Sequence, residues 1–519
     1  MDSGESHTSV ARPRKVRSSP KKQSVERPET SVSRSSAHHL SQPQNAATGE
    51  RRSVCPTPKV ATLVLLGSCA AILLLLQWSS RGYYSYSNSP RARQSRTTVD
   101  AGGWNVPDRK TVVNIGTNRC TIDRLWPDQI TTKLFEEKYQ YRRPLILRFR
   151  DGSDGWTDSK RWTRKELLRV YGKQIVGSGR SEDIVKDGGS GTNLSTLTKF
   201  VETLMEKPDA SGEPLYVFDR DFVPESDLLD SLHMPEFLKP DVKLHDSFLF
   251  LGSSKSGVTF HRHADAWNGV VFGLKRWFIY PPELTPPGGV WPGFSQLGWL
   301  RLVYPNLTED KLPMECVQRP GEVLYLPESF YHGTLNIGDT VAIGVQSVEA
   351  QTEYEGLGYA LNEFEKAAGS DKQSIWNERV KVYQTLLKQT PTNSQLLLAL
   401  GETLNAQGEV DKGLQMIKEA TQIDPFFVQA WANLATALMQ ESRLDEAEAA
   451  FKGALKANPV NVDVLMDYSE FLWLNKRDDR TSMEETLRFV TTIHEKQPSS
   501  ESRAFLKRLK THVKSLHNT

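Results

Sequence analysis

The chain has 519 residues, which is too long for one hydrophobic core and predicts two or three domains. Charged residues make up 25% of the chain and its net charge is +2, so the charge balance does not indicate binding to nucleic acid. Four cysteines are too few for a disulfide-rich scaffold.

Residues 1–59 are rich in Ser, Pro, Arg, Lys and Gln and hold almost no aromatic or branched apolar side chain. Such a segment cannot bury enough apolar surface to offset the entropy lost on ordering, so a disordered basic tail is predicted. Its run RPRKVRSSPKK is compatible with a nuclear address or a nucleic-acid-binding arm. We interpret it as a solvated tail beside a membrane and expect no nucleic-acid partner.

An uncharged apolar run, VATLVLLGSCAAILLLLQW, occupies residues 60–78. At 1.5 Å per residue it forms roughly 28 Å of helix, which is enough to cross the apolar core of a bilayer. A transmembrane helix is therefore predicted. Because no small-residue cleavage site closes the run, we interpret it as an uncleaved signal anchor. Arginine and lysine flank it on both sides, so the positive-inside rule does not decide its orientation.

A stalk rich in Ser, Tyr and Arg is predicted for residues 79–117. Beyond it, Asn193 and Asn306 each begin an Asn-X-Ser/Thr sequon and are candidate glycosylation sites. The sequons favour a type II membrane protein whose C-terminal body lies in the lumen of the endoplasmic reticulum or Golgi. In an oxidising lumen Cys120 and Cys316 can form a disulfide, and two buried thiols are the alternative.

Two stretches organise the central region, GVTFHRHADAWNGVVFGLKRWFIY and GEVLYLPESFYHGTLNIGDTVAIGVQ. Residues two apart in a strand face the same side, so Thr259, His261 and His263 are expected to share one face. Val258 is then expected on the other face. His332 follows an apolar strand; if both stretches belong to one barrel, it completes a three-histidine metal face with open coordination positions.

The motifs CTIDR, RRPLILR, FHRH, AWN, GLKRWFIYPPE and MECVQRPGEVLYLP together resemble the JmjC family of Fe(II)- and 2-oxoglutarate-dependent oxygenases, especially its small luminal members. The resemblance covers residues 120–346. It implies an all-β double-stranded β-helix of the cupin type with flanking helices over 118–350, in which the three histidines are catalytic and hold iron. The proline-rich segment 281–294 can be neither strand nor helix and is predicted to rim the pocket mouth.

The first ligand motif departs from the family pattern. Counting back from Gly273 and Lys275 puts His261 at the first ligand position. His263 then stands where the family usually has a carboxylate. A shifted register, in which Asp265 follows His263, restores His-X-Asp but shortens the run to Gly273, so we prefer the first register. Asp265 remains an alternative ligand or a hydrogen-bond partner of an imidazole.

The resemblance also implies which residues bind 2-oxoglutarate. Lys275, in GLK, would provide a fixed positive charge for the remote carboxylate of the keto acid. Asn268 and Asn336 match asparagines at the cofactor pocket of the family. Gly344 and Val258 stand where hydroxyl side chains are often found, so a sparse polar lining is expected.

After the second stretch the apolar periodicity changes from 2 to 3.6. Pro391, Pro425 and Pro459 are spaced by 34 residues, with small and large apolar residues recurring between them as in tetratricopeptide repeats. We therefore predict a linker helix at 351–375 and an all-α repeat solenoid at 376–519 that ends in a capping helix.

Repeats of this kind form a groove for an extended peptide or support a neighbouring domain, and we favour protein or peptide binding. The leading hypothesis is a membrane-anchored luminal protein hydroxylase that uses Fe(II) and 2-oxoglutarate and whose repeats present the substrate. The alternative is a catalytically silent adapter that keeps the JmjC fold and assembles partners through its repeats. Histone demethylation would require nuclear exposure, against which the predicted anchor argues.

Overall fold

The computed structural model describes residues 101–186, 191–208, 212–239, 245–290, 293–348, 352–496 and 498–517. These residues belong to one compact unit, Ser95–Thr519. The predicted basic tail, the transmembrane helix and most of the stalk lie outside the described residues. Within the described ranges, no helix combines the length and the apolar character needed to cross a bilayer.

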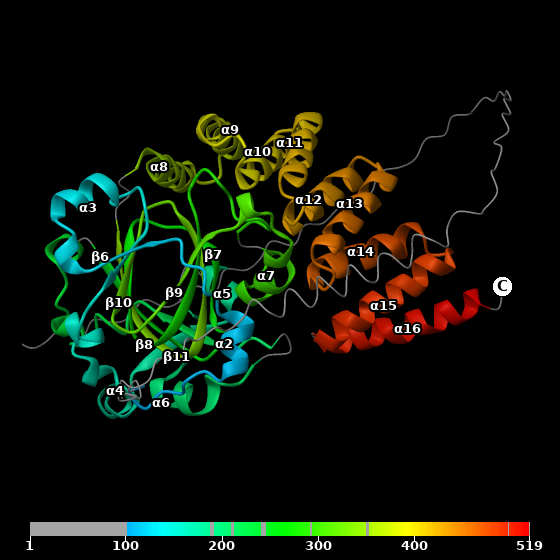
Figure 1. Cartoon of the computed structure of the whole chain (residues 1–519). Coiled ribbons are helices and arrows are strands. Elements are labelled where there is room, and N and C mark those ends of the chain that lie inside the picture. Colours follow the sequence, from blue (N-terminus) through cyan, green and yellow to red (C-terminus); the bar gives the residue numbers. More distant parts are fainter. Residues whose placement is uncertain are drawn as a thin grey trace, which may run out of the picture. The chain divides into compact units, whose positions relative to one another are not determined.

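The first part of the described chain is a mixed β-sheet domain (Figure 1). Its main strand order is β1-β2-β10-β8-β11-β6-β5-β3-β4, while β7 pairs with β11 and β9 pairs with β8. β1 runs parallel to β2, and the remaining pairs are antiparallel. The strands are β1 (Asp123–Leu125), β2 (Leu145–Arg148), β3 (Ile175–Gly179), β4 (Asn193–Thr196), β5 (Tyr216–Asp219), β6 (His245–Gly252), β7 (Gly257–His261), β8 (Ala266–Tyr280), β9 (Met314–Gln318), β10 (Glu322–Leu326) and β11 (Tyr331–Ser347).

The two long strands β8 and β11 each change partners halfway along. The first half of β8 pairs with β10 and its second half with β9, while β11 pairs first with β7 and then with β6. Their common ladder shifts register between Ile337 and Val341, beside Gly273 and Gly338, whose φ angles are +80° and +81°. A Cβ atom on Gly273 would lie 2.2 Å from the carbonyl oxygen of Asp339, so only glycine fits this break.

Short helices cover the sheet domain, and several begin at threonine or serine N-caps. Thr131 and Thr163 accept hydrogen bonds from backbone N–H groups of the helices that follow them, and Ser295 does the same for α7. These helices are α2 (Arg109–Ile115), α3 (Thr132–Lys138), α4 (Arg164–Tyr171), α5 (Ser181–Lys186), α6 (Leu197–Lys199) and α7 (Gln296–Leu302).

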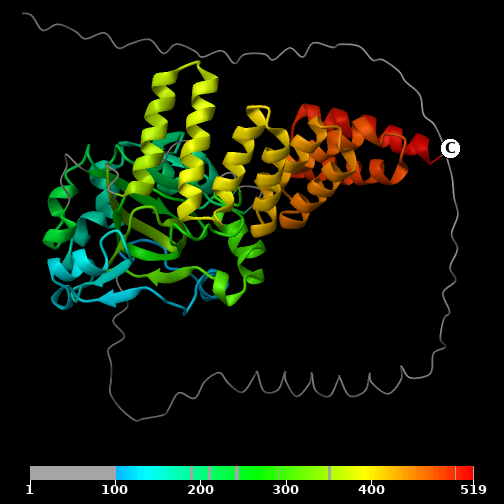
Figure 2. The same ribbon diagram turned by 90° about the horizontal axis from the view of Figure 1, so that it is seen from above.

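The second part of the described chain is helical (Figure 2, yellow-green to red). α8 and α9 pack together and precede the repeats. α8 occupies most of the segment predicted as a linker helix, and α9 begins in that segment and continues into the predicted solenoid. Asn393 and Asn461 cap α10 and α14, and Gly401 packs so closely that a Cβ atom would lie 2.6 Å from Ile417. The helices are α8 (Glu353–Ala368), α9 (Lys372–Gln389), α10 (Ser394–Ala406), α11 (Val410–Ile423), α12 (Val428–Gln440), α13 (Leu444–Ala457), α14 (Val462–Asn475), α15 (Arg480–Lys496) and α16 (Ser500–Leu516).

The repeat helices and the sheet domain share one apolar cluster, which runs from α7 into α10 to α16. At this junction the backbone N–H of Gly288 donates to the carboxylate of Asp424 (2.7 Å). The ring of Phe427 lies against Gly289, where a Cβ atom would be 2.5 Å from the ring. Segment 281–294 was predicted to rim the pocket mouth. Its glycine pair lies against the repeat helices, because two residues without side chains allow this close approach, and its Val290 lines a cavity beside His261.

Cys120 and Cys316 form a disulfide that joins the segment before β1 to strand β9. Cys316 is fully buried, whereas Cys120 lies at the surface. The two are 196 residues apart in sequence, so on the chain-entropy account the bond stabilises the fold by about 5 kcal/mol.

Candidate metal centre and adjoining pocket

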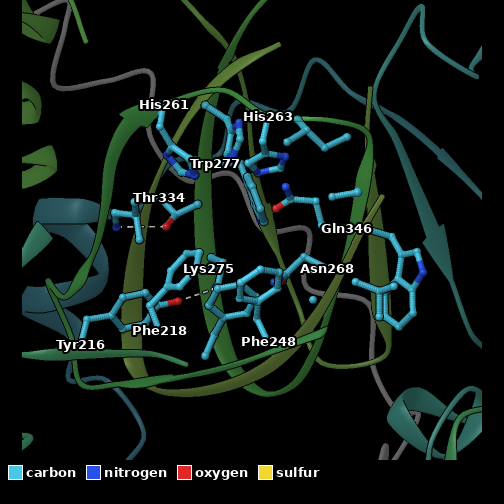
Figure 3. Close-up of a pocket in the computed structure, with 18 residues that line it drawn as sticks. Tyr216, Phe218, Phe248, His261, His263, Asn268, Lys275, Trp277, Thr334 and Gln346 are labelled. Atoms are coloured by element: carbon cyan, nitrogen blue, oxygen red, sulfur yellow. Dashed lines mark hydrogen bonds between the residues drawn. The ribbon is translucent and has the colours of Figure 1, made fainter. Parts of the chain in front are cut away.

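A pocket lies among strands β5, β6, β7, β8 and β11 (Figure 3). Its cavity volume is about 50 Å³, and it is partly open to solvent. Most of its wall is apolar and largely aromatic, with Phe218, Phe248, Phe250 and Trp277 as members. The side chains with polar groups that line it include His261, His263, His332, Lys275, Asn268, Tyr216, Thr334 and Gln346.

The three predicted ligands, His261, His263 and His332, come together at one end of this pocket. One potential ligand nitrogen of each lies within 4.8 Å of the others, and the ring centroids are 4.2 to 5.4 Å apart. His261 ends β7, His263 lies in the connection to β8, and His332 is the second residue of β11. Three elements therefore converge on a position suited to one metal ion.

Each imidazole is oriented by a backbone carbonyl close by in sequence. The Nδ1 pairs are His261 with Thr259 (2.9 Å), His263 with Ala264 (2.6 Å) and His332 with Phe330 (3.0 Å). A carbonyl oxygen only accepts hydrogen bonds, so Nδ1 carries the proton in each neutral ring. Nε2 then presents its lone pair, which is the arrangement that outer hydrogen bonds give to histidine ligands of metals.

Burial keeps these rings neutral. It lowers the pKa of His261 to about 3, with the neighbouring His263 as the next cause. Burial also lowers the pKa of His263, and burial followed by the two other imidazoles holds the pKa of His332 well below its usual range. All three rings are therefore in the form that binds a metal at neutral pH.

A β-bulge in β7 aims His261 into the pocket. His332 pairs with His261 and Thr334 with Val258, so three steps along β7 match two along β11. Strict alternation predicted that Thr259 would share the face of His261, and this was wrong. Val258 lines the pocket instead, and the Thr259 hydroxyl donates to the carbonyl of Phe294 (2.5 Å).

Asp265, the alternative ligand, is not part of the histidine group that the described residues form. Its negative charge acts elsewhere: burial first, and Asp265 second, raise the pKa of the phenols of Tyr141 and Tyr325. The structure therefore brings together the three residues expected if His261 is the first ligand. It does not bring Asp265 into the group, as the shifted register would require.

Lys275 lies at the other end of the pocket, below Trp277 in Figure 3. It is 1% exposed, its Nζ donates to the Tyr216 hydroxyl (2.9 Å), and Nζ lies 4.6 Å from the centre of the Phe250 ring. No carboxylate pairs with it in the described ranges, and burial lowers its pKa to about 7. A buried ammonium without a counter-ion is costly, and a bound anion would remove that cost.

The two predicted cofactor asparagines differ in position. Asn268 lines the pocket, and its buried Oδ1 accepts no hydrogen bond from any described residue. Asn336 is fully buried but is not among the lining residues; its Nδ2 donates to the Ser256 hydroxyl (3.0 Å). Asn336 therefore holds the turn before β7 and does not face the cavity.

Sequence reasoning did not single out Tyr216, Thr334 or Trp277 as pocket residues. Tyr216 lies on β5, for which no motif was recognised, whereas Thr334 is two residues after His332 and alternation along β11 would have found it. At Gly344, where a hydroxyl was expected to be missing, a Cβ atom would lie 2.5 Å from Phe250. The phenyl ring therefore fills that side of the pocket.

The two sequon asparagines are exposed. Asn193 begins β4, the last strand of the sheet order, and Asn306 follows α7, with its Nδ2 donating to the carbonyl of Leu302 (2.9 Å). Among the described residues, none covers either asparagine, so both are accessible to a glycosylating enzyme.

Comparison with known proteins matches both parts of the chain. The tetratricopeptide repeat family profile matches residues 432–480, within α12 to α15. JmjC domain-containing protein 8 of Homo sapiens is 33% identical over 250 residues, which are 47% of this chain and 88% of that protein.

Two further relatives are named for their activities. The bifunctional arginine demethylase and lysyl-hydroxylase psr-1 of Caenorhabditis briggsae is 26% identical over 288 residues, 50% of this chain and 70% of that protein. A 2-oxoglutarate and iron-dependent oxygenase of Gallus gallus is 28% identical over 109 residues, 18% of this chain and 25% of that protein. With its sheet domain, its histidine group and these likenesses, the chain belongs to the JmjC domain family and adds a tetratricopeptide repeat region to it.

Proposed function

We propose that the protein is an Fe(II)- and 2-oxoglutarate-dependent oxygenase that hydroxylates protein side chains. The observation that carries this proposal is Lys275, a buried ammonium without a carboxylate partner among the described residues, in the same pocket as three neutral imidazoles. The partner changes of β8 and β11 support our interpretation of the sheet as a double-stranded β-helix of the cupin type.

The side chains present fit both groups chemically. His261, His263 and His332 would hold iron through their Nε2 atoms, and Lys275 would bind the remote carboxylate of the keto acid. Bound iron with 2-oxoglutarate and O2 supplies the oxidising chemistry. The Tyr216 hydroxyl orients the ammonium, and aromatic rings form much of the pocket wall around it.

The carboxamide of Asn268 would also contact the keto acid. Its Oδ1 has no donor among the described residues, so the amide is free to turn and present its N–H groups to an anionic oxygen. Asn336 would act indirectly, because its bond to the Ser256 hydroxyl supports the strand pair that carries Lys275.

The size of the pocket requires a rearrangement on binding. A cavity of about 50 Å³ has room for roughly four water molecules, and 2-oxoglutarate is larger. We expect the Phe250 and Trp277 rings to turn when the keto acid enters. Because Trp277 is fluorescent, its emission should change on binding.

The same narrow cavity, and the histidine in place of a carboxylate, favour the second candidate function. In that case the protein is a catalytically silent adapter that uses the JmjC fold as a scaffold and binds protein or peptide partners through its repeats. Tetratricopeptide repeats are commonly used for protein binding, and in the enzyme they would present the substrate.

Anaerobic titration of the full chain with Fe(II) and 2-oxoglutarate separates the two functions. The oxygenase should bind the keto acid in the presence of the metal, and Lys275→Ala should abolish this binding. A native protein that binds no keto acid would be the adapter.

The location that we propose is the lumen of the endoplasmic reticulum or Golgi, reached by a type II signal anchor at residues 60–78. The Cys120–Cys316 disulfide and the two exposed sequons support this location, since both modifications belong to the secretory pathway. In sealed microsomes the C-terminal body should resist added protease and should shift in mobility after glycosidase treatment. Digestion of that body in intact vesicles would place it in the cytosol.

A further inference from the structure

Helix α14 exposes one face that combines carboxylates with large apolar side chains. Its members recur at steps of three and four residues, which places them on one side of the helix. They are Asp463, Met466, Asp467, Glu470 and Leu474, and we call them the acidic face. Leu474 is 66% exposed and Met466 is 49% exposed. Apolar side chains bordered by charged ones are typical of surfaces that bind another protein.

The three carboxylates of the acidic face have no cationic partner among the described residues. They also repel one another: partial burial first, and then Asp463 and Glu470, raise the pKa of Asp467. The two cations that follow α14 are engaged elsewhere, Lys476 in an ion pair within the repeats and Arg477 over an indole ring. A partner that brings positive charge to this face would therefore relieve the repulsion.

Helix α16 exposes a face of the opposite charge. Its members follow one another at steps of four, three and four residues; they are Arg503, Lys507, Lys510 and Lys514, which we call the basic face. All four side chains are exposed, and none forms an ion pair or side-chain hydrogen bond with another described residue. A helix that ends a repeat array needs a polar surface, which mixed charges would also provide. A stripe of four cations therefore indicates an anionic partner.

The two faces match in length and spacing. Residues 463–474 and 503–514 each form roughly 16 Å of helix at about 1.5 Å per residue. Steps of four, three and four read the same in both directions, so the faces match whether the two helices run parallel or antiparallel. Three cations can meet the three carboxylates, and the methylene stem of the fourth can cover Leu474.

The two faces of one chain do not meet. α16 contacts α14 through another side, where the ring centres of Phe505 and His512 lie 5.5 Å and 5.4 Å from that of Trp473. At about 100° per residue, Phe505 and His512 lie on the side of α16 opposite the basic face. The basic face is therefore directed away from the α14 helix of its own chain and can reach only another molecule.

We propose that the acidic face of α14 binds the basic face of α16 in a second copy of this chain. An unrelated basic segment would satisfy the acidic face alone, whereas a second copy satisfies both faces at once. Because each copy carries both faces, the contact is reciprocal, and a two-fold axis closes the dimer. An axis perpendicular to the membrane also keeps both predicted anchors in one bilayer. This dimer does not depend on the oxygenase activity proposed above.

The test reverses the charge of each face in the full chain in detergent. The acidic-face variant is Asp463→Lys/Asp467→Lys/Glu470→Lys, and the basic-face variant is Lys507→Glu/Lys510→Glu/Lys514→Glu. We expect multi-angle light scattering to give the protein mass of two chains for the native protein and of one chain for each variant, because like charges then face one another. An equimolar mixture of the two variants should recover the mass of two chains, since both contacts then join opposite charges.

A control variant carries the same change of charge at exposed positions of the sheet domain, Glu136→Lys/Glu202→Lys/Asp230→Lys, and should keep the mass of two chains. All the substituted side chains are exposed, so every melting temperature should stay within a few degrees of the native value. A native protein with the mass of one chain, variants that keep the mass of two chains on their own, or a mixture that stays at one chain would overturn the proposal.

Salt provides a second measurement that needs no variant. At about 1 M salt, exposed charges are screened beyond about 3 Å, so the native dimer should dissociate to single chains. A native dimer that keeps its mass at this salt concentration would be held by other contacts, and the proposed pairing of α14 with α16 would be wrong.

Discussion

The two ends of the first pocket are built on opposite principles. At one end, three imidazoles have their protons fixed by nearby carbonyls and are stable as neutral groups without a ligand. At the other end, Lys275 is buried against aromatic rings, donates to one phenol and has no counter-ion among the described residues. Three histidines bind many divalent metals, so they do not specify the ligand closely. A buried ammonium without a counter-ion lowers stability, and the binding of an anion would offset that cost, so Lys275 specifies the ligand more closely.

Removing one metal ligand should have the largest effect. His332→Ala deletes the most deeply buried imidazole, and we expect Fe(II) affinity to fall by more than about 100-fold, beyond what loss of an outer hydrogen bond costs. Anaerobic calorimetry measures this Fe(II) affinity. His233→Ala changes an exposed histidine outside the group and serves as the matched control. Equal affinities in the two variants would contradict the metal centre.

Lys275→Met should separate stability from ligand binding. We expect keto-acid affinity to fall by about 100- to 1,000-fold, the effect of losing a buried charged partner. The ligand-free protein should become more stable at pH 7, by on the order of a few kcal/mol, because one hydrogen bond to Tyr216 does not offset burial of the wild-type ammonium without a counter-ion.

Chemical denaturation and keto-acid titration measure the two effects of Lys275→Met. Lys173→Met, at an exposed position, is the control and should change neither. If Lys275→Met destabilises the ligand-free protein, the ammonium has a structural partner and its proposed role is wrong.

The affinity for 2-oxoglutarate should depend on pH through Lys275. Burial lowers the pKa of the free ammonium to about 7, and a bound carboxylate raises it, so binding above pH 7 takes up a proton. Affinity should therefore weaken by about tenfold per pH unit between pH 7 and 9. Lys275→Arg keeps its charge throughout this range, and a residual slope in that variant would assign the titration to another group.

Restoring the carboxylate of the family pattern should have the smallest effect. His263→Asp lowers the positive charge around the metal, and we expect Fe(II) affinity to rise by up to about tenfold. Competition against Zn(II), which neutral imidazoles bind more tightly than Fe(II), is the most sensitive measurement. Weaker Fe(II) binding would mean that the site is adapted to three neutral ligands.

The sequence predicted the parts of this pocket that depend on local motifs. The two imidazoles separated by one residue, the distant His332 and the lysine of GLK all lie where the resemblance puts them. The 34-residue spacing likewise predicted a repeat region, because that period is a property of the chain itself. Each of these depends on short spacing or on a strict period.

The predictions that failed concern residues whose positions depend on contacts between distant segments of the chain. One extra residue in β7 changed which neighbour of His261 enters the pocket, and nothing in GVTFH marks a bulge. Asn336 turns to Ser256, about 80 residues earlier, and Tyr216 reaches Lys275 from another strand. Single-sequence alternation carries no information on such partners.

The apolar cluster shared by α7 and the repeats bears on how such proteins diversify. The human relative is matched over 88% of its length by 250 residues, which leaves it too little chain for a repeat region of this size. In this chain, removal of the repeats would expose the apolar surface that Phe427 shields at Gly289, and polar groups or another chain would have to cover it. A version of this chain without its repeats would therefore need substitutions in the sheet domain at the junction as well as the deletion itself.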